Sequence, residues 1–148
     1  MSVALSSLSI PGHAEQLIEA HKQNLPIQRR RAPDGRHTAL AFVRTELFFG
    51  TAKPDGAVTE RQFNTFLDYV VTPLFPDGLT VVKGGGQFRG ANGLTIKEDS
   101  YVLILLHPFE TQKADSKSID AIRQEYMRQH QQESVLRVDD PFLVWVSF

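Results

Sequence analysis

Apolar and polar residues alternate from Leu40 to Gly50, which is the clearest β-strand pattern in the chain. Neighbouring side chains of a strand point to opposite faces of its sheet. One face carries Val43, Thr45, Leu47 and Phe49, and the other carries Phe42, Arg44, Glu46 and Phe48. The pattern predicts a strand that packs into a core on one side and presents Arg44 and Glu46 on the other.

Two later segments have the spacing of amphipathic helices. The first begins with a capping box at residues 59–62 and carries an apolar stripe from Phe63 to Leu74, with Pro73 and Pro76 expected to end it. The second runs from about residue 116 to residue 132. Its stripe consists of Ile119, Ile122, Tyr126 and His130.

Further strands are predicted at residues 79–82, 94–97, 100–107, 134–138 and 142–148. The glycines at residues 84–86 are expected to interrupt the second strand or to form a bulge, with the strand resuming at Gln87. From Tyr101 to Leu106 the return strand is apolar on both faces, which predicts burial on both.

The predicted order is β-α-β-β-α-β with one extra strand at the C-terminal end. This order indicates an α+β fold, the ferredoxin-like sandwich, with an antiparallel sheet, its first and third strands central, and two helices on one face. Residues 39–148 are expected to form this domain, and residues 1–38 a partly flexible N-terminal extension.

Both helices would cover the same face of the sheet, so the other face would meet solvent. Phe48 and the apolar return strand contribute to that face. Large exposed apolar patches usually mark interfaces, so the sequence predicts self-association, as a homodimer or a homotrimer.

Composition narrows the classes of function. The chain has 148 residues, a formal net charge of -1 and no cysteine, which excludes disulfides and cysteine chemistry and gives no reason to expect a nucleic-acid partner. The apolar runs are too short for a membrane span of about 20 residues, so no membrane partner is expected. We see no signal peptide and expect a cytoplasmic location. The 5 histidines have no metal-ligand spacing, so no metal or cofactor is expected.

Candidate chemistry centres on the charged face of the first strand. Arg44 and Glu46 are either a structural ion pair or a site in which Arg44 holds an anionic ligand and Glu46 accepts a proton. His107, at the end of a strand, is a second acid/base candidate. Gly84, Gly85 and Gly86 are either an anion nest or part of a bulge. The predicted ligand pocket comprises Arg44, Glu46, Gln87, Arg89 and Arg137.

Several motifs resemble those of the bacterial family known as domain of unknown function 3574. They are RTELFFG at 44–50, VTPLFPDGLTV at 71–81, GQFR at 86–89 and QESVLRVD at 132–139. The likeness covers about residues 40–148 and implies a fold but no activity. A more distant resemblance, in residues 78–87, is to PII-like and CutA proteins, which are ferredoxin-like trimers. In PII proteins a loop of this kind lies beside a bound nucleotide, but this chain lacks their long signalling loop and has Phe88 at a polar position.

Three functions agree with these features. The first is a small oligomeric module that binds an anionic small molecule or acts in regulation. The second is a cofactor-independent enzyme of the dimeric α/β-barrel type that uses Glu46 or His107 as acid/base. The third is a partner-binding structural protein.

Overall fold

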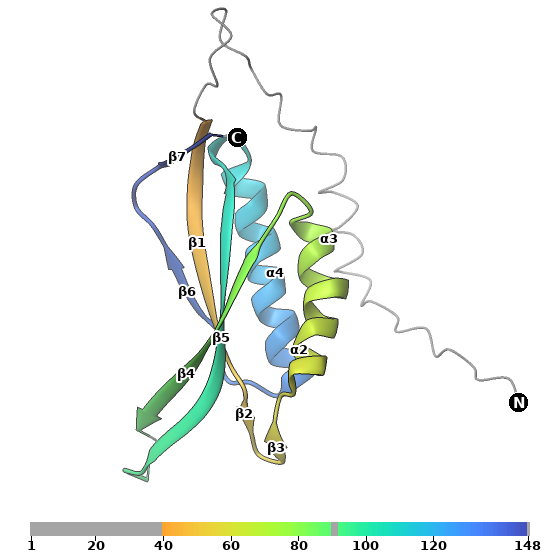
Figure 1. The fold of residues 1–148 in the computed structure, drawn as a ribbon, viewed down its shortest axis with the longest axis vertical. Helices are drawn as coiled ribbons and strands as arrows, with labels where there is room; N and C mark the ends of the chain where they lie inside the picture. The colour runs from red at the N-terminus through yellow and green to blue at the C-terminus, as the bar shows by residue number, and fades with distance from the viewer. Residues whose placement is uncertain (1–39, 90–91, 148) are drawn as a thin grey trace, which may run out of the picture.

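The computed structural model describes residues 40–89 and 92–147 (Figure 1). The strands are β1 (Leu40–Gly50), β2 (Ala52–Lys53), β3 (Gly56–Ala57), β4 (Thr80–Arg89), β5 (Thr95–Pro108), β6 (Leu136–Asp139) and β7 (Val144–Val146). The helical segments are α2 (Glu60–Phe66), η1 (Leu67–Val71), α3 (Thr72–Leu74), η2 (Phe109–Thr111) and α4 (Gln112–His130). The predicted N-terminal extension lies outside the described residues.

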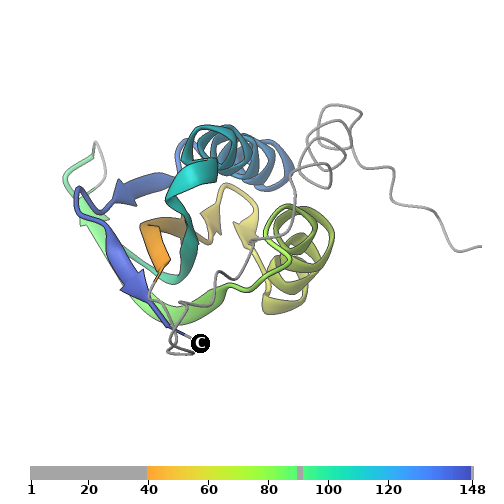
Figure 2. The ribbon, with the colours of Figure 1, turned by 90° about the horizontal axis from the view of Figure 1, so that it is seen from above.

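The sheet has the order β4-β5-β1-β6, and β7 pairs with the first residues of β1. All of these pairings are antiparallel. Both long helices lie on the same side of the sheet (Figures 1 and 2). The predicted ferredoxin-like arrangement is therefore confirmed, with the first and third predicted strands, β1 and β5, at its centre.

The alternation of β1 divides the sheet into a covered and an open side. Leu47 and Phe49 are completely buried beneath the helices, whereas Arg44 is exposed. The predicted helix stripes supply the other half of the core, and nearly all of their residues are buried: Phe63, Phe66, Val70, Val71, Leu74, Ile119, Ile122, Tyr126 and His130.

The first helix begins as predicted but passes through a proline. The Gln62 amide donates to Thr59 Oγ1, and the Thr59 amide donates to Gln62 Oε1, which completes the capping box. Pro73 was expected to end the helix, but it lies inside α3. The preceding segment, η1, is a π-helix, and such a wider turn makes room for the proline ring that would otherwise meet a carbonyl of the previous turn.

The glycine run neither bulges nor forms a nest, so both expectations were wrong. The β4–β5 register is continuous from Thr80 to Arg89, with Gly84 opposite Ser100 and Gly86 opposite Glu98. None of the three glycines has a positive φ angle, whereas a nest alternates right- and left-handed residues. They form an ordinary ladder instead of the loop that the PII-like resemblance implied.

The two predicted segments of the return strand form one strand, β5, of 14 residues. The pairing of β1 with β5 ends where Gly50 faces Ser100, so β5 and β4 continue past the end of β1. This two-stranded extension, residues 84–89 and 95–99, is called the arm below, and it projects from the body of the domain in Figure 1.

Aromatic rings fill the core beneath β1. Phe49 packs edge-on against Tyr126 with 4.6 Å between ring centroids, and Tyr126 lies 4.6 Å from the His130 ring. Burial lowers the pKa of His130 below its ordinary value of 6.5, and nearby Lys53 lowers it further, while Glu125 opposes this shift. The shift therefore favours the neutral imidazole inside the core.

This burial predicts a loss of stability in mild acid. When the pH falls through about 6.5, the unfolded chain gains a proton that the folded His130 resists, so the free energy of unfolding decreases. Replacing His130 with glutamine removes this titration. Urea unfolding at intervals between about pH 7.5 and pH 5.5 should show a shallower decline for His130→Gln than for the parent. Identical slopes would show that His130 does not carry the effect.

Candidate functional site

Arg44 and Glu46 form an ion pair on the side of the sheet that the helices leave uncovered. Arg44 Nε and Nη2 donate to Glu46 Oε1 at 3.0 and 2.5 Å. The side chains are 44% and 24% exposed, so both meet solvent and a ligand can reach them. The prediction that these two side chains are neighbours on one face of the strand is confirmed.

Apolar side chains surround this ion pair. Arg44 lies opposite Leu106, and Glu46 lies between Ile104 on β5 and Val138 on β6. Alternate residues of the other strands share this face, here called the open face, and several are large and exposed: Val82, Phe88, Leu106, Leu136 and Val138. The predicted burial of the return strand, β5, on both faces is correct on one side only, since Leu106 is 44% exposed.

The rest of the predicted pocket does not converge on Arg44 and Glu46. Gln87 and Arg89 lie opposite Lys97 and Thr95, on the arm, and their positions in the register place them on the other face of the sheet. A shallow hollow on the arm is lined by Gly85, Gly86, Gln87, Lys97, Glu98 and Asp99. The glycine run and Gln87 thus lie together, away from the ion pair.

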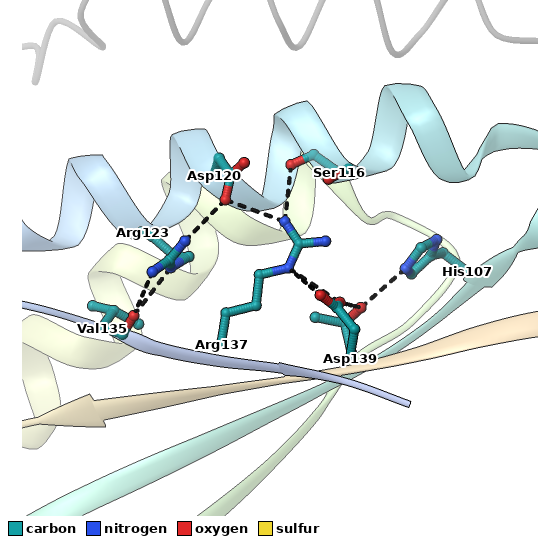
Figure 3. Close-up of polar contacts among 8 residues, drawn as sticks. His107, Ser116, Asp120, Arg123, Val135, Arg137 and Asp139 are labelled. Carbon is teal, nitrogen blue, oxygen red and sulfur yellow. Dashed lines mark hydrogen bonds and ion pairs between the residues drawn. The ribbon is translucent and has the colours of Figure 1, made fainter. Parts of the chain in front are cut away.

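Arg137 was expected on the same side as Glu46, and this was wrong. It pairs with Leu47, so it belongs to the covered face, and its side chain points from β6 toward α4 (Figure 3). Its guanidinium contacts Asp120 Oδ1 at 3.2 Å and Asp139 Oδ2 at 2.9 Å. Arg123, bonded to Asp120 and to the Val135 carbonyl, continues this link between β6 and α4.

His107 also lies on the covered face, and its side chain is only 3% exposed. Its Nε2 is 3.3 Å from Thr45 Oγ1, which donates to Asp139 Oδ1 at 2.7 Å. Figure 3 labels His107 and Asp139. His107 Nδ1 lies 3.2 Å from Asp115 Oδ2, close enough for an ion pair but not aligned as a hydrogen bond. Sequence reasoning missed this network, although Thr45, a polar residue on the apolar face of β1, was a visible signal. Because the sheet separates His107 from the open face, it cannot contact a ligand bound there.

A second arrangement that the sequence did not reveal surrounds the end of β1. Glu98 accepts hydrogen bonds from the amides of Thr51 and Ala52 at 2.8 and 2.6 Å. Gln132 Nε2 donates to the Ala52 carbonyl, and the Tyr126 hydroxyl donates to the Gly50 carbonyl. Burial raises the pKa of Tyr126, which keeps this donor protonated. The result is a fixed junction between β1, α4 and the base of the arm.

Over residues 40–89 and 92–147, no three histidine or acidic side chains are grouped so that they could hold a metal ion. No helix in the same residues is long and apolar enough to cross a membrane.

The fold and the open face define a small α+β domain with two helices on one side of an antiparallel sheet and a charged pair on the other. A family model described as protein of unknown function (DUF3574) matches residues 44–148, so the chain belongs to this family. No curated protein matches the sequence.

Two solved structures of a phage SAM lyase resemble the fold. In complex with S-methyl-5'-thioadenosine, the lyase has a TM-score of 0.57 and 13% identity, over 76% of this chain and 95% of the lyase. The apo structure has a TM-score of 0.53 and 15% identity, over 73% of this chain and 90% of the lyase. At these identities the likeness concerns the fold alone.

Gly50 explains one position of the RTELFFG motif and provides a test of the junction. A Cβ at Gly50 would lie 2.9 Å from Glu98 Oε1 and 3.2 Å from Gln132 Oε1. Gly50→Ala should displace the Glu98 carboxylate from its two amides and lower the free energy of unfolding by about 1–3 kcal/mol, as measured by urea titration.

Gly84→Ala is the matched control, because its Cβ would come no closer than 3.7 Å to Ser100 Oγ. This variant should stay within about 0.5 kcal/mol of the parent. Equal losses in the two variants would contradict the assigned role of the close approach at Gly50.

Proposed function

We propose that this protein is a small-molecule binding module that holds an organic anion on the open face, with Arg44 as the anion contact. The observation that carries the proposal is the ion pair of Arg44 and Glu46, which stands among apolar side chains on the side of the sheet away from the helices. An apolar surface with a few placed polar groups is typical of ligand sites.

The chemistry of the pair suggests which ligands suit it. A guanidinium binds carboxylates and phosphates through paired N–H donors, and Glu46 now occupies two of the Arg44 donors. An incoming anion would replace Glu46 as the partner of Arg44. The apolar part of the ligand would rest on Phe48, Ile104 and Leu106, which share the open face. The proposal therefore specifies an anion that carries an apolar group.

A second candidate is an enzyme in which Glu46 accepts a proton. The likeness to the phage SAM lyase favours it, since it shows that an enzyme is built on this fold. An Arg–Glu pair is also suited to a substrate with both a carboxylate and a cationic centre, because each side chain would neutralise one charge. Of the two acid/base candidates only Glu46 supports this proposal, because His107 lies on the covered face.

Octanoate and octanol separate the role of charge from that of the apolar chain. Octanoate should bind more tightly than octanol, and Arg44→Gln should remove this preference. The expected loss is about tenfold in affinity, the worth of one hydrogen bond to a charged group. Glu46→Gln should tighten octanoate binding, because the competing carboxylate is removed. Isothermal titration calorimetry measures both effects.

Arg128→Gln provides the control, because Arg128 also pairs with a glutamate, Glu125, but lies on α4. It should leave both affinities unchanged. Equal binding of octanoate and octanol to the parent would contradict the proposal, as would an Arg128→Gln effect as large as that of Arg44→Gln.

The enzyme candidate is tested by incubation with S-adenosylmethionine, with release of S-methyl-5'-thioadenosine followed by liquid chromatography. The parent should release product, and Glu46→Gln should abolish release while S-adenosylmethionine still binds. A parent that binds octanoate but leaves S-adenosylmethionine intact supports the binding module. Release that persists in Glu46→Gln would remove Glu46 from the second candidate.

A further inference from the structure

β4 has one edge that the described part of the chain does not use. Within residues 40–89 and 92–147, β4 pairs with β5 alone, so the N–H and C=O groups along its other edge have no strand partner there. Proteins usually protect such edges with prolines, bulges or charges, because a free edge accepts another strand. β4 contains no proline and no bulge over its 10 residues. Its one central charge, Lys83, extends toward Glu60 and Asp99 at 3.6 and 3.8 Å.

The glycine run in β4 has no explanation within the described part of this chain. A Cβ at Gly85 would meet nothing within 4 Å, and at Gly84 and Gly86 nothing closer than 3.7 Å. The angle φ is not positive at any of the three. Glycine weakens a strand and generally accompanies a bulge, a bend or the close approach of a ligand or another backbone. The register excludes the bulge, and the run carries no side chains that would hinder a second strand beside β4.

We propose that β4 pairs antiparallel with β4 of a second copy of this chain, with a two-fold axis at Gly85. In this register Val82 faces Phe88 of the partner subunit, and the same contact occurs again across the axis. Val82 and Phe88 are 48% and 50% exposed and share the open face, so each supplies the apolar neighbour that the other lacks. Aromatic residues and β-branched residues are favourable partners across strands.

The neighbouring registers fit less well. An axis at Gly86 would place Lys83 opposite Arg89 of the partner subunit, and like charges opposite one another are destabilising. An axis at Gly84 would place Val82 opposite Gly86 of the partner subunit and lose the contact with the aromatic ring. With the axis at Gly85, Lys83 meets Gln87 of the partner subunit, which carries no charge. The sequence of β4 is thus self-complementary in one register.

This pairing joins two sheets edge to edge and makes their open faces continuous. It specifies a homodimer, and it stands whether or not the open face binds the anion proposed above. It also gives a role to Phe88, the residue at which this chain departs from PII-like proteins.

The lack of cysteine in the chain allows a clean cross-linking test in the full-length protein. Directly opposite residues of antiparallel strands have Cα atoms about 4.5–5.5 Å apart, within the range of a disulfide. Gly85→Cys should therefore form a covalent dimer under mild oxidation. An equimolar mixture of Val82→Cys and Phe88→Cys should cross-link. Each variant alone should not, because the two cysteines of such a dimer would lie six positions apart along the paired strands, about 20 Å.

Leu136→Cys is the control for random collision, because it is 60% exposed on the open face but belongs to β6. It should remain uncross-linked. Val82→Cys that cross-links with itself as readily as with Phe88→Cys would overturn the register. Failure of Gly85→Cys to cross-link would overturn the two-fold axis.

Sedimentation equilibrium tests the interface without a covalent bond. The parent should be a dimer at tens of micromolar, and Phe88→Asp should be a monomer with an unchanged circular dichroism spectrum. Leu136→Asp should remain a dimer. A monomeric or trimeric parent would overturn the proposal. So would a Leu136→Asp variant that dissociates while Phe88→Asp does not, because that result would assign the interface to the open face.

Discussion

The position of β1 is the constraint on which the rest of the molecule depends. It is hydrogen-bonded on one edge to β5 and on the other to β6 and β7, so it lies at the centre of the sheet. Its covered face supplies Leu47 and Phe49 to the core, and its open face supplies Arg44 and Glu46 to solvent. Because side chains alternate strictly along a strand, a shift of one residue would bury the charges and expose the core. Both the core and the candidate site are therefore fixed by one register.

What the sequence could predict depended on local patterns. The alternation in β1, the capping box at Thr59 and the helix stripes each involve residues within one element, and the structure has them as expected. The faces of Arg137, Gln87 and Arg89 depended on the pairing of distant strands, which local patterns do not encode. Arg137 faces α4 because it pairs with Leu47, and that pairing is fixed by tertiary structure. The local pattern around His107 was uninformative for the same reason, since its partner Thr45 lies 62 residues away in sequence.

Several positions of the RTELFFG and QESVLRVD motifs have an architectural role. Gly50 admits the Glu98 carboxylate, Thr45 bonds to Asp139, and Gln132 holds the Ala52 carbonyl. Arg137 connects β6 to α4 through Asp120, and Asp139 pairs with Arg137. By contrast, Arg44 and Glu46 contact one another on the surface, and the core does not require either charge. This difference separates residues that maintain the fold from a surface pair that the fold does not need.

The Glu98 junction also ties the arm to the end of β1. Glu98 lies just before the point where β5 leaves β1, and its carboxylate is fixed by two amides that follow Gly50. The strands beyond it have no third strand beside them in the described structure, so the Glu98 contacts link the arm to the end of β1. One carboxylate thus joins the projecting arm to the backbone that leaves the central strand, so the arm is fastened to the body of the domain by a side chain as well as by its strands.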